Sequence, residues 1–149
     1  MKGGDGLDLY QQALLEHARS PLNYQVIDNS SHQAFGKNRL CGDSITIYLR
    51  IQNDRIEDCS FSGESCAICK GTASLLTDNL KGRSLNEVES LMEAFNIFVE
   101  TWDLSDQRLK SFEPLLALKK YPTRLKCLLL PWKTAQSALV GEDKTVTTE

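Results

Sequence analysis

The chain has 149 residues, of which 41% are hydrophobic, and its 20 acidic and 17 basic residues give a net charge of -3. This length and composition predict one soluble domain over residues 1–149, with a core from about 7 to 140. No basic run would follow a phosphate backbone, and no window is long and apolar enough to span a bilayer. Nucleic acid and membrane are therefore not expected partners.

The two ends of the chain are expected to be flexible. Residues 1–6 have no apolar stretch typical of a signal peptide, which favours a cytoplasmic location, and the polar tail from residue 141 to 149 is expected to fray. The chain contains five cysteines. In a reducing compartment, this odd number favours metal or sulfur chemistry over a disulfide framework.

The first half of the chain predicts one helix and a hairpin. Apolar residues at steps of three and four predict a helix over residues 7–19, followed by a loop and a short strand up to residue 40. Strict alternation over residues 45–51, a turn at Asn53-Asp54 and a returning run over residues 55–62 predict two antiparallel strands.

The second half of the chain is expected to be helical, which makes the fold class α+β. One helix is expected from Cys66 to about Leu80, and Ser84-Leu85-Asn86-Glu87 has the pattern of a capping box that begins a second. Pro114 interrupts the helical pattern of residues 102–120, so two short helical pieces are expected there. The last helix is expected over residues 123–140.

Three cysteines and one aspartate are the candidate metal ligands. Cys41-Gly42-Asp43 precedes a strand, where extended backbone would send both functional side chains to the same side. Cys66 follows a polar turn at a helix start, where free amides and the helix dipole favour the reactive thiolate. With Cys127, these residues supply three sulfurs and one oxygen, enough for a tetrahedral zinc site, although the spacing alone is only suggestive.

The chain resembles the U-type iron–sulfur assembly proteins, which include IscU, the N-terminal part of NifU, and SufU. The resemblance covers nearly the whole chain. It rests on Leu9-Tyr10, His17, Pro21, Asn23, Cys41-Gly42-Asp43, Ile56-Glu57-Asp58, the run from Phe61 to Ile68, and Arg124-Leu125-Lys126-Cys127 before Trp132. It implies a small antiparallel three-stranded sheet with helices packed on one face, and it implies Cys41, Asp43, Cys66 and Cys127 as metal ligands.

Two departures favour the SufU-like branch of this family. IscU proteins have a histidine just before the last active-site cysteine, where this chain has Lys126, and a proline-rich motif where this chain has Lys120-Tyr121-Pro122-Thr123-Arg124. The stretch over residues 82–120 also resembles an insertion found in SufU proteins.

The branch implies a zinc-dependent sulfur acceptor. Such a protein takes persulfide sulfur from a SUF-type pyridoxal-phosphate cysteine desulfurase and passes it to a downstream iron–sulfur assembly complex, as a sulfur carrier rather than a conventional turnover enzyme. Cys41 is the expected acceptor, because a loop cysteine should move more easily than a helix cysteine. One alternative is a scaffold that builds a transient [2Fe–2S] cluster on the same ligands. A purely structural zinc is disfavoured, because Asp43 is a weak choice of ligand where a fourth thiol is available.

Several other residues have more than one interpretation. Cys69 stands where the family usually has serine, and it is either a packing residue, which we favour, or a resolving thiol, a spare ligand or a second sulfur carrier. Cys59 is expected to be a buried core thiol, and His17 to pack rather than bind metal, while His32 is ambiguous. Lys126 and Cys69 are expected to lie next to the metal ligands without binding the metal themselves, and Lys126, Arg124 and Lys70 are expected to offset the negative charge of the site.

Overall fold

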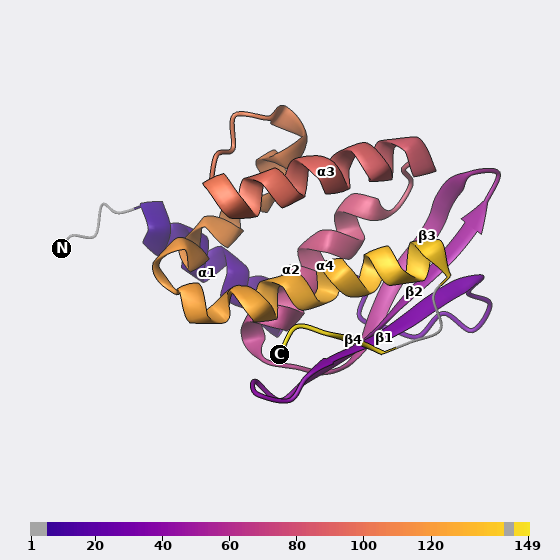
Figure 1. Ribbon diagram of the computed structural model, residues 1–149, viewed down its shortest axis with the longest axis horizontal. Helices are drawn as coiled ribbons and strands as arrows, with labels where there is room; N and C mark the ends of the chain where they lie inside the picture. The colour runs from indigo at the N-terminus through magenta and orange to yellow at the C-terminus, as the bar shows by residue number, and fades with distance from the viewer. Residues whose placement is uncertain (1–5, 142–144) are drawn as a thin grey trace.

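The computed structural model describes residues 6–141 and 145–149 (Figure 1). Residues 1–5 and 142–144, which belong to the two ends expected to be flexible, lie outside this description. Within the described ranges, no helix has the length and apolar character that a membrane span requires.

Helices and strands follow one another in an α+β order. They are α1 (Gly6–Arg19), β1 (His32–Asn38), β2 (Asp43–Gln52), β3 (Arg55–Glu64), α2 (Ala67–Leu80), α3 (Leu85–Thr101), the 3-10 helices η1 (Gln107–Lys120) and η2 (Pro122–Arg124), α4 (Leu125–Val140), and β4 (Val146–Thr147). The predicted hairpin is confirmed as β2 and β3, and Asn53 and Asp54, both with positive φ, form its two-residue turn.

Among the residues that the structure describes, the sheet has four strands in the order β3-β2-β1-β4, not the expected three. The strands β1, β2 and β3 are antiparallel, but β4 pairs with β1 in parallel through Gly36–Val146 and Lys37–Thr147. The prediction of a purely antiparallel sheet was therefore wrong in this detail. A short stretch of the tail covers part of the otherwise open edge of β1, where free backbone groups need partners.

Helices cover one face of the sheet. Along β2, Asp43, Ile45, Ile47 and Leu49 are buried, while the residues between them are only partly covered. Figure 1 shows the strands on one side of the molecule, with α4 lying between them and α3. The alternation in the sequence thus defines the buried face, since successive side chains of a strand point to opposite sides.

The starts of α2 and α3 agree with the predictions from the sequence, whereas the segment after α3 differs from its prediction. Cys66 caps α2 and Ser84 caps α3 with the predicted capping box. The two helical pieces expected over residues 102–120 are instead one 3-10 span, η1, with Pro114 inside it, and the last helix begins at Leu125 rather than at residue 123. Tight turns with hydrogen bonds over three residues are a common alternative where α-helix geometry is interrupted.

An aromatic cluster joins residues 82–120 to α4. The Trp132 ring of α4 stacks on Phe95 of α3, with 3.6 Å between ring centroids, and meets Phe112 of η1 edge-on. All three side chains are fully buried. The segment that resembles an insertion is therefore part of the core that fixes the helix carrying Cys127.

Candidate metal centre

The four predicted ligands come from three separate segments. Cys41 lies in the turn between β1 and β2, and Asp43 is the first residue of β2. Cys66 is the N-cap of α2, and Cys127 lies in the first turn of α4. The N-termini of α2 and α4 therefore meet the turn between β1 and β2, and the positive ends of the two helix dipoles favour negative charge there.

Three of the four donors form a compact group. The Sγ atoms of Cys127 and Cys41 are 3.1 Å apart, and donor atoms of Cys41, Asp43 and Cys127 all lie within 4.8 Å of one another. Sulfurs that share a tetrahedral zinc are separated by about 3.8 Å, as zinc–sulfur bonds of about 2.3 Å require. The three donors are thus grouped closely enough to hold a metal ion, although the two sulfurs lie closer together than zinc would hold them.

Cys66 lies beside this group but falls outside it. Its Sγ is 3.8 Å from Oδ2 of Asp43, and its backbone N–H donates to Oδ1 of the same carboxylate at 2.7 Å. Asp43 is 2% exposed, so its charge is shielded from water and held by this amide. Because the amide occupies Oδ1, Oδ2 is the oxygen left for a metal ion.

Gly42 brings Cys41 and Asp43 together by a turn rather than by extended backbone. Its φ is +70°, in the left-handed region that glycine adopts without strain. The amides of Cys41 and Gly42 donate back to the carbonyls of Asn38 and Arg39 at 3.2 and 3.3 Å, which closes the turn. The thiol and the carboxylate lie together as expected, and Gly42 provides the tight turn that a glycine predicts between them.

Burial is the main influence on the pKa of the Cys66 and Cys127 thiols. Desolvation raises the pKa of Cys66 above its ordinary value, although the amide of Cys69 acts in the opposite direction. Burial, followed by a hydrogen bond with Cys41, raises the pKa of Cys127 strongly. The expectation that the helix start alone activates Cys66 was therefore wrong, since the cost of burying a thiolate exceeds the benefit of the amides.

The other cysteines differ in their distance from the site. Cys59 is fully buried in β3, as expected, and burial raises its pKa. Cys69 is also fully buried, and its amide donates to Sγ of Cys66 at 3.4 Å. Its thiol feels the charges of Asp43, Cys66 and Cys41, but burial is the main cause of its raised pKa. Cys69 therefore contacts the candidate ligand Cys66 through its backbone amide without belonging to the compact donor group.

The three basic residues that were expected to offset the charge of the site have different surroundings. The Lys126 side chain is exposed, and Lys70 places its Nζ 4.4 Å from the Tyr24 ring. Arg124 has a buried Nε with no hydrogen-bond partner in the described chain. The charge-offsetting roles of these residues thus stay predictions.

The two histidines have other contacts. Nδ1 of His17 is 2.8 Å from the Ser74 hydroxyl, and burial lowers the pKa of His17. His32, at the start of β1, contacts the Ser31 hydroxyl at 2.8 Å. Neither belongs to the metal-binding group found in the described residues.

Sequence reasoning did not identify Asn38 and Thr148. The buried Asn38 amide nitrogen lies 3.8 Å from Sγ of Cys41 and 3.4 Å from the Thr148 hydroxyl, while its Oδ1 accepts from the Leu40 amide. Thr148 in turn donates to the carbonyl of Lys126 at 3.0 Å. The tail thus ties the Cys41 turn to the start of α4, which no local pattern in the sequence indicates.

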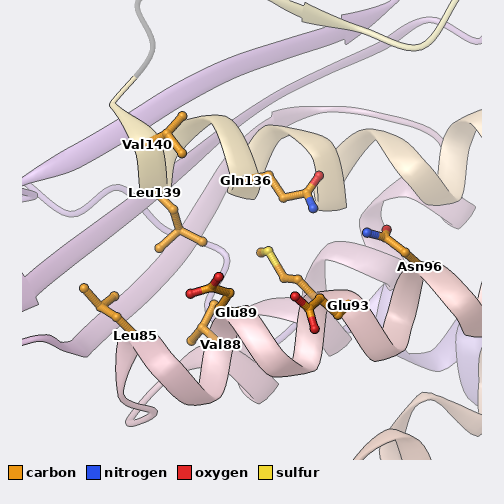
Figure 2. Close-up of a pocket in the computed structure, with 9 residues that line it drawn as sticks. Leu85, Val88, Glu89, Glu93, Asn96, Gln136, Leu139 and Val140 are labelled. Atoms are coloured by element: carbon orange, nitrogen blue, oxygen red, sulfur yellow. The ribbon is translucent and has the colours of Figure 1, made fainter.

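A groove elsewhere on the surface is not part of this centre. It has a volume of about 480 Å³, lies between α3 and α4, and is lined by residues such as Val88, Glu89 and Leu139. Figure 2 shows Glu89 and Glu93 facing Gln136 across it. None of its lining residues is a cysteine.

Fold and site together define a small α+β protein with a candidate metal centre of cysteine and aspartate. The chain belongs to the family described as the NifU-like N terminal domain, whose sequence profile matches residues 9–128. It is similar to the iron-sulfur cluster assembly scaffold protein IscU of Thermotoga maritima, with 33% identity over 88% of this chain and 92% of that protein.

Two further similarities concern proteins named SufU. The zinc-dependent sulfurtransferase SufU of Bacillus subtilis is 31% identical over 91% of this chain and 92% of its own length. The crystal structure of FiSufU from Fervidobacterium islandicum AW-1, described as a candidate iron-sulfur cluster assembly scaffold protein for the SUF system, is 29% identical. It aligns with a TM-score of 0.79 over 91% of this chain and 99% of that chain.

Proposed function

We propose that this protein works in iron–sulfur cluster assembly as a sulfur acceptor for a pyridoxal-phosphate cysteine desulfurase, with zinc held by Cys41, Asp43, Cys66 and Cys127. The observation that carries this proposal is that side-chain donors from the turn between β1 and β2 and from the starts of α2 and α4 lie close together. The similarity to a protein named zinc-dependent sulfurtransferase supports it. A reducing cytoplasm is the expected location, because it keeps such thiols free.

The donor set fits zinc chemically. Thiolate sulfur and carboxylate oxygen are both common zinc ligands, and zinc would keep the bound thiols deprotonated at neutral pH. Cys66 lies outside the compact group, so its Sγ must move toward Cys41 and Cys127 to complete four ligands. Asp43 restrains this end of the site, since it accepts the Cys66 amide.

Cys41 is the residue proposed to accept sulfur. It lies in a turn and is partly exposed, whereas Cys127 is fully buried in a helix. Its neighbour Leu40 is 76% exposed, which gives the turn an apolar tip for a partner protein to contact. In the transfer, Sγ of Cys41 attacks the outer sulfur of the donor persulfide, the donor S–S bond breaks, and the donor cysteine leaves as a thiolate.

The test combines metal analysis with a sulfur-transfer assay. We expect about one zinc per chain after aerobic purification and, with desulfurase and cysteine, a persulfide that mass spectrometry places on Cys41. Cys41→Ser should abolish the persulfide. Cys59→Ala is the matched control, since it removes a buried cysteine outside the site. A persulfide unchanged in Cys41→Ser would refute the assignment of the acceptor.

The scaffold function is the second candidate. The relative from Thermotoga maritima is named as a scaffold protein, and the same four donors suit an iron–sulfur cluster. Anaerobic reconstitution with iron and sulfide distinguishes the two functions. A stable [2Fe–2S] absorbance that is lost in Asp43→Ala, with no stimulation of the desulfurase, would favour the scaffold.

A further inference from the structure

Cys66 and Cys69 form a C-x-x-C pair at the start of α2. Cys66 is the N-cap, with extended backbone at φ -68° and ψ 165°, and Cys69 is the third helical residue. The Cys69 amide donates to Sγ of Cys66 at 3.4 Å. The side chain of the first cysteine therefore already points along the helix toward the second.

This arrangement is compatible with a disulfide inside the helix turn. In helical geometry, Cα atoms three residues apart are separated by about 5 Å. That separation lies within the range of about 4.4–6.8 Å found in disulfides. Sγ of Cys66 already contacts the backbone nitrogen of Cys69, which is three bonds from the Cys69 sulfur. Side-chain rotations, without movement of the helix, can bring the two sulfurs together.

The two thiols differ in access. Cys66 is partly exposed, whereas Cys69 is fully buried. An external reagent therefore meets Cys66 first, and Cys69 can reach only what is attached to Cys66. This difference in access sets the order of the two steps, because the rate of thiol–disulfide exchange depends on how accessible the attacking thiol is.

We propose that Cys66 and Cys69 are a thiol–disulfide exchange site that reacts with low-molecular-weight disulfides. Sγ of Cys66 attacks the disulfide RSSR and releases one RSH, which leaves a mixed disulfide on Cys66. Sγ of Cys69 then attacks Sγ of Cys66, and the second RSH leaves with the Cys69 proton. The two protein thiols are oxidised to one disulfide while RSSR is reduced to two RSH, and a dithiol reductant reverses the reaction.

Formation of this disulfide removes Cys66 from the proposed ligands. A sulfur bound in a disulfide has no thiolate charge to offer a metal ion. Zinc bound at the site and the Cys66–Cys69 disulfide therefore exclude each other. The exchange itself requires neither zinc nor a desulfurase. It can therefore be tested independently of the proposed sulfur transfer.

A competing disulfide must be distinguished from this one. The Sγ atoms of Cys41 and Cys127 are 3.1 Å apart, so oxidation could join them instead. The sequence separates the two products, because trypsin cleaves after lysine and arginine. Cys66 and Cys69 fall in the single peptide 56–70 together with Cys59, whereas Cys41 and Cys127 fall in peptides 40–50 and 127–133.

The experiment treats reduced, full-length, metal-free protein with glutathione disulfide, alkylates the remaining thiols and analyses the tryptic peptides by mass spectrometry. We expect peptide 56–70 to lose two hydrogen atoms and to carry one alkyl group, on Cys59. Dithiothreitol should restore three alkylated cysteines. Oxidation found only as a cross-link between peptides 40–50 and 127–133 would overturn the proposal.

Two variants test the order of attack. Cys69→Ser should stop at glutathione bound to Cys66, because the resolving thiol is missing. Cys66→Ser should leave Cys69 reduced, and its serine still caps the helix. Glutathione on Cys69 in that variant would overturn the assigned roles. The mapping on the unaltered chain keeps the proposal testable if a variant fails to fold.

Zinc release gives a second readout. Zinc-loaded protein treated with glutathione disulfide should release zinc in step with formation of the internal disulfide. Full retention of zinc while the Cys66–Cys69 disulfide accumulates would overturn the mutual exclusion.

Discussion

The carboxylate of Asp43 accepts the backbone amide of Cys66 at 2.7 Å, which joins the first residue of β2 to the first turn of α2. This contact places the start of a helix against the start of a strand, 23 residues earlier in the chain. Asp43 therefore has two separable tasks under the proposed function: one oxygen positions the Cys66 backbone, and the other would bind the metal ion.

Substitution of Asp43 should separate these tasks. Asp43→Asn keeps an oxygen that can accept the Cys66 amide but removes the charge, so we expect zinc affinity to fall at least about 10-fold with little change in metal-free stability. Asp43→Ala also leaves the amide without its partner, which should cost about 1–3 kcal/mol in the metal-free chain. Zinc titration and chemical unfolding measure the two effects. Unchanged zinc affinity in both variants would remove Asp43 from the ligands.

Gly42 and Gly82 offer a matched pair of substitutions. Both have positive φ, +70° and +87°, and among the described residues no heavy atom beyond the glycine and its two chain neighbours lies within 4 Å of the position where a Cβ would stand. Alanine at either position should cost about 1–2 kcal/mol of unfolding free energy through backbone strain. Because only Gly42 lies between Cys41 and Asp43, only Gly42→Ala should also weaken zinc binding. Equal zinc affinity in the two variants would show that this turn does not set the metal geometry.

Thr148 is expected to restrain the turn that carries Cys41. Thr148→Ala removes the hydrogen bond to the Lys126 carbonyl and the contact with Asn38. The loss of about 0.5–1.5 kcal/mol should open the turn more often and raise the alkylation rate of Cys41 roughly 2- to 10-fold in metal-free protein. Thr145→Ala is the control, because Thr145 makes no hydrogen bond to this turn in the described chain. Equal rates in both variants would contradict the restraint.

His17 should make the stability of the fold pH-dependent. Burial lowers its pKa below the ordinary value of 6.5, and the buried Ser74 hydroxyl, which accepts the Leu22 amide at 2.8 Å, is left to donate to Nδ1 of the neutral ring. The unfolded chain binds more protons between the two pKa values, so stability rises with pH through this window. The stabilisation is complete above about 6.5 and is lost as pH falls through the folded-state pKa.

The measurement for His17 is the free energy of unfolding against pH. We expect it to fall below pH 6.5 in the natural chain and to fall less steeply in His17→Gln, which cannot gain a proton. Identical pH profiles for the two proteins would show that other groups cause the decline.

Local patterns in the sequence determined most of the secondary structure. The alternation along β2, the two-residue turn after it and the capping box at Ser84 each depend on neighbouring residues, and each was predicted correctly. The segment after α3 was not, because Pro114 marks an interruption without saying which tight helical geometry replaces the α-helix.

The sequence by itself determined which side chains have metal-binding chemistry and, through the family resemblance, predicted Cys41, Asp43, Cys66 and Cys127 as one ligand set. In the structure, the donor atoms of Cys41, Asp43 and Cys127 lie within 4.8 Å of one another. Only the tertiary structure decided that burial raises the pKa of Cys66, that the Cys69 amide donates to Sγ of Cys66, and that Thr148 of the tail contacts Asn38 and the Lys126 carbonyl. The physical reason is the separation along the chain between the residues that interact. Capping and alternation act within a few residues, whereas burial and contacts between the tail and the hairpin depend on segments that meet only when the chain is folded.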